Sequence, residues 1–140
     1  IYHEVEKIKR SDESMSVIMI DVNDFKYIND AFGHIAGDVV LKECAMILEK
    51  SIRASDVLFR FGGDEFLIVM SKAAEEETGI LIQRIYDNLA LWNDEQSEID
   101  HKISLSIGFS LLDKEQDLLD VLEEADQQMY VDKKRYKEND

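Results

Sequence analysis

Three acidic side chains stand where a metal-dependent reaction could use them. Asp21 ends the apolar stretch 16–22, and Asp64 and Glu65 directly follow a pair of glycines. If the strand that ends at Asp21 lies beside the hairpin that carries the glycines, the carboxylates converge at one end of a sheet. Such oxygen ligands suit Mg²⁺, which binds one or two carboxylates and completes its shell with water and phosphate oxygens. Asp and Asn are also common turn residues, and the spacing alone favours that plainer interpretation.

The elements that must position these residues follow from the periodicity of apolar side chains. The predicted strands are 16–22, 57–61, 65–70 and 102–110; the predicted helices are 2–11, a short helix within 23–32, one that begins at 38, 78–92 and 117–134. The glycine pair 62–63 predicts a tight hairpin, because such turns need positive φ at their central positions. The order of elements predicts an α+β sandwich with the sheet on one side and the helices on the other.

Composition limits the classes of function. The chain has 140 residues, of which 45% are hydrophobic and 34% charged, as in a soluble globular domain. Its net charge of −15 argues against binding of nucleic acid, and no apolar run is long enough to cross a bilayer. The single cysteine, Cys44, lies in a helical apolar pattern, so we expect a buried core thiol and a reducing, cytoplasmic environment.

The string Gly62-Gly63-Asp64-Glu65-Phe66 is the signature after which the GGDEF family of diguanylate cyclases is named. The segment 21–30 (DVNDFKYIND) resembles the first conserved block of that family, and the resemblance continues through 106–108 and 125–133. It therefore covers nearly the whole chain. It implies a palm-type fold, ferredoxin-like or nucleotidyl cyclase-like, with a central, mostly antiparallel sheet flanked by helices. We expect residues 1–140 to form one catalytic domain of a longer multidomain sensor protein, whose other parts could hold a membrane anchor.

The activity that the resemblance implies is the condensation of two GTP molecules into cyclic di-GMP and two pyrophosphates. Each domain would bind one GTP, so catalysis would need a homodimer, with no nucleic acid partner and no membrane contact by this domain. By resemblance, Asp21, the carbonyl of Val22 and Asp64 would hold two Mg²⁺ or Mn²⁺ ions per active site, and Glu65 would orient or deprotonate the attacking 3′-hydroxyl. Asn23 stands where the family has Asp; this change is harmless if the position only supports the loop, and weakens turnover if it tunes metal affinity.

The resemblance also implies the residues that bind substrate. Backbone amides at a helix start would bind the terminal phosphates, the glycine pair would let the backbone approach a phosphate, and two lysines would pair with phosphates. An amide and a carboxylate would read guanine. The amides are those of Asp24, Phe25 and Lys26, and the glycine pair is Gly62 and Gly63. The lysines are Lys133 and Lys137, and the guanine-reading residues are Asn29 and Asp38. Lys137 stands where the family has Arg, and Tyr136 where it has Gly. The lysines could instead complement a helix dipole, and Asp38 could serve as an N-cap, alone or as well.

An inhibitory site for the product is implied by Arg53 and Asp56, which match the RxxD pattern of the family, and by Arg84 on the following helix. Arg and Asp also commonly close surface loops. The alternative to an active cyclase is a degenerate module that binds GTP or cyclic di-GMP as a sensor. Degenerate members usually lose the signature acids or glycines, and this chain keeps them, which favours the enzyme.

Overall fold

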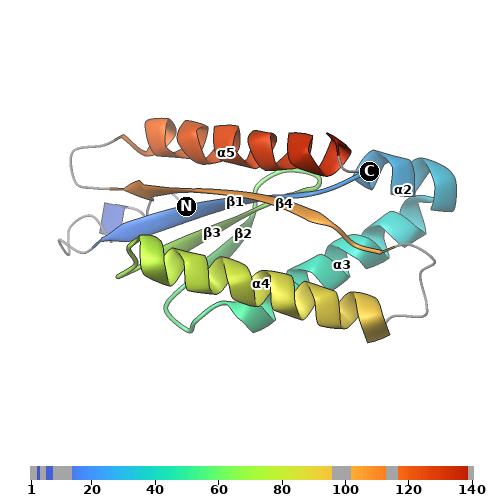
Figure 1. Cartoon of the computed structure of the whole chain (residues 1–140), viewed down its shortest axis with the longest axis horizontal. Coiled ribbons are helices and arrows are strands. Elements are labelled where there is room, and N and C mark those ends of the chain that lie inside the picture. Colours follow the sequence, from blue (N-terminus) through green and yellow to red (C-terminus); the bar gives the residue numbers. More distant parts are fainter. Residues whose placement is uncertain (1–2, 4–5, 8–13, 96–101, 113–116, 139–140) are drawn as a thin grey trace.

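A four-stranded antiparallel sheet forms the centre of the molecule (Figure 1). The computed structural model describes residues 3, 6–7, 14–95, 102–112 and 117–138. The strands are β1 (Met15–Val22), β2 (Val57–Arg60), β3 (Glu65–Ser71) and β4 (Leu105–Leu112), in the spatial order β2-β3-β1-β4; the helices are α2 (Phe25–Phe32), α3 (His34–Ser51), α4 (Glu75–Glu95) and α5 (Leu118–Glu138). The predicted helix 2–11 lies largely outside the described residues, of which His3, Glu6 and Lys7 are helical.

Helices cover both faces of the sheet, so the predicted arrangement with helices on one side only is wrong. Ile18 and Ile20 of β1 pack with α3 and α4, whereas Val17 and Met19 pack with α5 on the opposite face (Figure 1). Every residue of β1 is buried, as expected for a strand enclosed on both sides. The order of elements, from which one helical layer was predicted, does not show on which face each helix packs, and in β4 both Ser106 and Ser110 are buried.

The chain turns sharply between α2 and α3 at Gly33, whose φ of 91° is a conformation that favours glycine. Because the turn is completed there, α3 begins at His34 rather than at Asp38. Asp38 therefore lies inside the helix, and its predicted alternative role as an N-cap is wrong. Cys44 on the same helix is a fully buried core thiol, as predicted, and burial raises the pKa of its thiol to about 12.

The glycine pair between β2 and β3 does not form the predicted tight turn with positive φ. Among the described residues, Gly33 is the one glycine with positive φ. The strands are instead joined by residues 61–64, and the N–H groups of Phe61 and Gly62 both donate to the carbonyl of Glu65, at 2.9 and 3.3 Å. A side chain at Gly63 would meet no heavy atom within 4 Å, so this part of the loop faces open space.

The packing of α5 on β4 depends on Gly108. A Cβ there would overlap the carbonyl oxygen of Ala125 and the amide nitrogen of Met129, so the backbones of helix and strand meet directly. Side chains of α5 also bind β4: Asp132 accepts a hydrogen bond from the N–H of Ile107 at 2.9 Å. Among the described helices, none combines the length and apolar character that a membrane span requires.

Replacement of Gly108 by Ala is expected to destabilise the fold, because the added methyl must push the α5 backbone away from the sheet. Overpacking of this kind typically costs about 1–3 kcal/mol, measured as the free energy of unfolding in urea. The matched control is Gly79→Ala, since Gly79 is exposed in α4 and a Cβ there meets nothing within 4 Å. The control is expected to be neutral or slightly stabilising. Equal stabilities of the Gly108→Ala variant and the wild-type chain would contradict this account.

Candidate active site

The three predicted acidic residues converge at one end of the sheet. β1 and β3 are antiparallel neighbours, and Asp21 is paired directly with Glu65. The N–H of Val22 donates to the carbonyl of Asp64 at 3.0 Å, which holds the hairpin loop against the end of β1. One carboxylate oxygen from each of Asp21, Asp64 and Glu65 lies within 4.8 Å of the others. Asp21 is buried, and the other two are half-buried.

This donor set fits a hard divalent cation. It offers carboxylate oxygens alone, the ligands that Mg²⁺ and Mn²⁺ prefer over nitrogen and sulfur. The acids also disfavour their own ionisation. Burial is the main reason that the pKa of Asp21 is raised, with Asp64 adding to the rise and the hydrogen bond from Lys133 opposing it. The pKa of Glu65 is raised by burial and then by the charges of Asp21 and Asp64. A bound cation would relieve this repulsion.

Lys133 joins the acidic residues from the far end of the chain. Its Nζ lies 2.5 Å from Oδ2 of Asp21, and this bond raises the pKa of the lysine. The contact exists because Asp21 has the same parity along β1 as Val17 and Met19, so its side chain faces α5. Lys137, one turn later, lines the same cavity of about 800 Å³ as Asp21, Glu65 and Lys133. The structure thus brings both predicted lysines to the acidic site.

The loop that follows β1 leads directly into α2. Asp24 adopts a left-handed conformation with φ 58° and ψ 27°, and the helix begins at Phe25, followed by Lys26. The predicted phosphate-binding amides therefore lie at a helix N-terminus, immediately beyond the end of β1 that carries Asp21. The hydroxyl of Tyr136 donates to Oδ2 of Asp24 at 2.7 Å.

Asn23, which stands where the resemblance implies Asp, joins this loop to the β4 segment. It is buried, donates from Nδ2 to Oγ of Ser104 at 2.9 Å, and accepts from Oγ of Ser106 at 2.7 Å. Both functions of the amide are thereby used in contacts with the β4 segment. The structure thus gives this position a loop-supporting role.

The predicted guanine-reading residues lie on neighbouring helices. Asn29 of α2 packs against α3 at Gly37, where any Cβ would overlap the Asn29 side chain. Asp38 is the next residue and lines a cavity of about 330 Å³ together with Leu41 and Phe66. Gly37 therefore makes room for the Asn29 amide beside Asp38.

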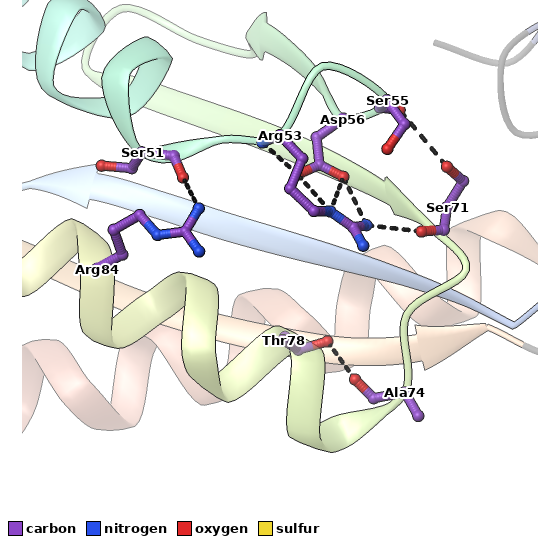
Figure 2. A network of polar contacts seen from close by, with 8 residues as sticks. All are labelled: Ser51, Arg53, Ser55, Asp56, Ser71, Ala74, Thr78 and Arg84. Atoms are coloured by element: carbon purple, nitrogen blue, oxygen red, sulfur yellow. Dashed lines mark hydrogen bonds and ion pairs between the residues drawn. The ribbon is translucent and has the colours of Figure 1, made fainter.

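Arg53 and Asp56 lie beside Ser71, the last residue of β3 (Figure 2), whereas Glu65 of the acidic group is its first residue. β3 runs from Glu65 to Ser71, so at about 3.3 Å per residue the two ends are roughly 20 Å apart. The Arg53 guanidinium binds the Asp56 carboxylate at 2.8 Å and the carbonyl of Ser71 at 2.7 Å. The Asp56 side chain is fully buried, while that of Arg53 is 35% exposed.

The third predicted member of the inhibitory site, Arg84, binds elsewhere. Its guanidinium donates to the carbonyl of Ser51 at 2.8 Å, at the end of α3 (Figure 2). The structure thus joins Arg53 to Asp56 directly, and it places Arg84 on the helix that faces the same connection between α3 and β2.

Two residues near the site were missed by the sequence analysis. Arg60 donates to the carbonyls of Gly62 and Gly63, at 3.3 and 2.7 Å, and so fixes the loop that carries Asp64. Tyr136 reaches the loop after β1 from the last turns of α5. Neither contact has a local sequence signal, because Arg60 binds backbone atoms and Tyr136 binds a residue 112 positions away.

The fold is of the palm type, and three acidic residues lie together at one end of its sheet. The family profile described as "Diguanylate cyclase, GGDEF domain" matches residues 1–139, and the chain belongs to this family. The diguanylate cyclase DosC of Escherichia coli is 36% identical over 137 residues, which cover 94% of this chain but 29% of DosC. The chain thus spans less than a third of that relative.

Solved structures agree with this assignment. The diguanylate cyclase SiaD of Pseudomonas aeruginosa, solved with its activator SiaC, superposes with a TM-score of 0.86 at 27% identity, over 96% of this chain and 52% of that one. The active GGEEF domain of a diguanylate cyclase from Vibrio cholerae superposes with a TM-score of 0.79 at 32% identity, over 92% of this chain and 82% of that one. The predicted fold class, a mainly antiparallel sheet flanked by helices, is confirmed.

The crowding of acids predicts that Glu65→Gln stabilises the metal-free chain. The pKa of the Glu65 carboxyl is raised in the folded state, so the folded state holds that proton more tightly than the unfolded state does. The free energy of unfolding therefore falls as pH rises through this pKa. The variant should therefore exceed the wild type in Tm by a few degrees at pH 7 with EDTA. The difference should vanish near pH 4 and below, where the unfolded glutamate also becomes protonated.

The control for this prediction is Glu123→Gln, which neutralises an exposed glutamate of α5. It is expected to leave Tm nearly unchanged at both pH values. A Glu65→Gln variant that is less stable than the wild type at pH 7 would show that the acids are not in repulsion.

Proposed function

We propose that this domain is a diguanylate cyclase, which condenses two GTP molecules into cyclic di-GMP and two pyrophosphates. The observation that carries the proposal is the convergence of Asp21, Asp64, Glu65 and Lys133 beside a helix N-terminus, in a chain of the GGDEF family. The 3′-hydroxyl oxygen of one GTP attacks the α-phosphorus of the other, the bond to the β-phosphate breaks, and pyrophosphate leaves. The same step repeated in the other direction closes the ring.

The chain's own groups would divide the work between binding and catalysis. Asp21, Asp64 and the carbonyl of Val22 would hold two Mg²⁺ or Mn²⁺ ions. When bound, such ions polarise the phosphate and lower the pKa of the attacking hydroxyl. Glu65, across the strand pair from Asp21, would orient that hydroxyl and accept its proton. Lys133 would then exchange its bond to Asp21 for a phosphate oxygen, with Lys137 beside it in the same cavity.

Binding of the nucleotide would use three further parts of the structure. The amides of Asp24, Phe25 and Lys26 would bind the terminal phosphates at the positive end of α2. The open space at Gly63, next to Gly62, would admit the phosphate chain. Asn29 and Asp38 would read guanine, since a carboxylate accepts hydrogen bonds from N1–H and the 2-amino group, which adenine does not offer on that edge. One GTP per domain requires two domains that face each other, so we propose that the active form is a homodimer, in the cytoplasm.

We also propose that Arg53 and Asp56 bind cyclic di-GMP as an inhibitory site, with Arg84 as a further contact. The exposed third of the Arg53 side chain is open to a ligand, whereas the Asp56 side chain is fully buried and paired with Arg53. Cyclic di-GMP must therefore replace part of this ion pair, as well as the bond from Arg53 to Ser71, when it binds.

The decisive experiment incubates the chain at high concentration with GTP and Mg²⁺ and identifies the products by mass spectrometry. Cyclic di-GMP is expected from the wild type, and its rate is expected to fall by at least about a hundredfold in Asp64→Asn, as is usual when a group that stabilises transition-state charge is lost. Glu123→Gln, far from the chemistry on the exposed face of α5, is the matched control for loss of one negative charge.

A chain that forms no product is then fused to a dimerising coiled coil and assayed again. Absence of cyclic di-GMP even from the fused dimer would contradict the proposal. Binding of GTP or cyclic di-GMP without turnover would identify a sensor module instead.

The packing of Asn29 against Gly37 predicts a specific defect in guanine binding. Gly37→Ala must displace the Asn29 amide, a flexible group that can move without unfolding the helices. Loss of one hydrogen bond of about 1–1.5 kcal/mol corresponds to a rise in the KM for GTP of about tenfold. The Tm should change little, and Gly79→Ala should leave the KM unchanged. An unaltered KM in the Gly37→Ala variant would exclude Asn29 from guanine recognition.

A further inference from the structure

We propose that Tyr136 is a positioning residue that keeps the phosphate-binding end of α2 open by holding the Asp24 carboxylate away from it. The inference rests on the proposed binding of GTP at this helix start. It begins from the hydrogen bond between the Tyr136 hydroxyl and Oδ2 of Asp24, at 2.7 Å, which joins the last turns of α5 to the loop after β1.

Asp24 occupies the N-cap position of α2 with a left-handed backbone, whereas an aspartate that caps a helix with its carboxylate usually has an extended one. Here Asp24 makes no such side-chain capping bond in the described part of the chain, and its carboxylate is bound to Tyr136 instead. The amides at the start of α2 are thereby left for another acceptor. A carboxylate that capped them would occupy the same donors as a terminal phosphate and would repel its charge.

The tyrosine can hold this carboxylate because α5 is firmly attached to the sheet. The helix backbone packs directly on Gly108, and Asp132 accepts the N–H of Ile107. Lys133 and Tyr136 are three residues apart, so they lie on the same face of the helix. One turn of α5 thus carries both the ammonium group that binds Asp21 and the hydroxyl that binds Asp24.

The left-handed backbone of Asp24 makes the arrangement testable at both partners. A φ of 58° is strained for most residues but is readily adopted by glycine. Asp24→Gly should therefore keep the loop and its backbone amide while removing the carboxylate. In that background the hydrogen bond from the Tyr136 hydroxyl to the Asp24 carboxylate no longer exists.

The experiment measures, by calorimetry with Mg²⁺, the Kd of 3′-deoxy-GTP, which lacks the attacking hydroxyl and cannot be turned over, and of GMP, which lacks the terminal phosphates. Tyr136→Phe is expected to raise the Kd of 3′-deoxy-GTP about tenfold, which corresponds to about 1.4 kcal/mol of binding free energy. The Kd of GMP is expected to stay unchanged. Added to Asp24→Gly, the same substitution should have no effect. Tyr86→Phe is the matched control, since it removes another tyrosine hydroxyl that binds a carboxylate, that of Asp132 of α5, at 3.3 Å.

Each other outcome overturns the inference. Equal weakening of 3′-deoxy-GTP and GMP would show that Tyr136 acts on the fold as a whole. A full loss that persists in the Asp24→Gly background would show that Tyr136 acts on the nucleotide without Asp24. Failure of the wild-type chain to bind either nucleotide would overturn the proposed function, and this inference with it.

Discussion

The burial of β1 on both faces is the constraint on which the rest of the molecule depends. Because each face of this central strand needs a cover, α3 and α4 pack on one side and α5 on the other. The alternation of side chains along a strand then decides where Asp21 points. It lies on the α5 face, so the last helix of the chain, rather than its nearest neighbours in sequence, supplies the cation of the site. The close approach of α5 in turn requires a residue without a side chain at Gly108.

Electrostatic repulsion between the acidic residues opposes their close approach in the folded chain. Three carboxylates share one end of the sheet, and burial and mutual repulsion raise the pKa values of Asp21 and Glu65. A chain optimised for stability alone would not retain such a group of charges. Neighbouring contacts offset this electrostatic cost. Lys133 neutralises part of the charge, and Arg60 binds a backbone carbonyl of the loop on which Asp64 lies. The arrangement therefore suits the doubly charged ion and the phosphate oxygens of the proposed reaction.

Much of this could be predicted from the sequence, since the signals are local. The end of an apolar strand placed Asp21, and a glycine pair between two strands placed Asp64 and Glu65, so their convergence followed once the two strands were taken as neighbours. The second helical layer was missed because the order of elements along the chain does not show on which face of the sheet each helix packs. Ser106 and Ser110 of β4 are buried, and their hydroxyls bind Asn23 and Glu124.

Contacts between distant segments could not be predicted in the same way. The amide of Asn23 is fixed by serines more than 80 positions away, and the carboxylate of Asp24 by a tyrosine 112 positions away. No spacing rule connects such residues. The glycines at 62 and 63 show a different limit, because their presence suggested a turn of positive φ, whereas neither has positive φ in the structure and a Cβ at Gly63 would meet no heavy atom within 4 Å.

The attachment of α5 to β4 also governs how this sheet can meet other chains. β4 is an edge strand, and its outward N–H groups at Ile107 and Phe109 are occupied by Asp132 and Gln128 of the helix. The opposite edge is formed by β2, which has only four residues. Short or occupied edges give a foreign strand little to add to, which protects against aggregation through the sheet. The homodimer that we propose for catalysis is thereby kept from becoming an irreversible strand-to-strand association.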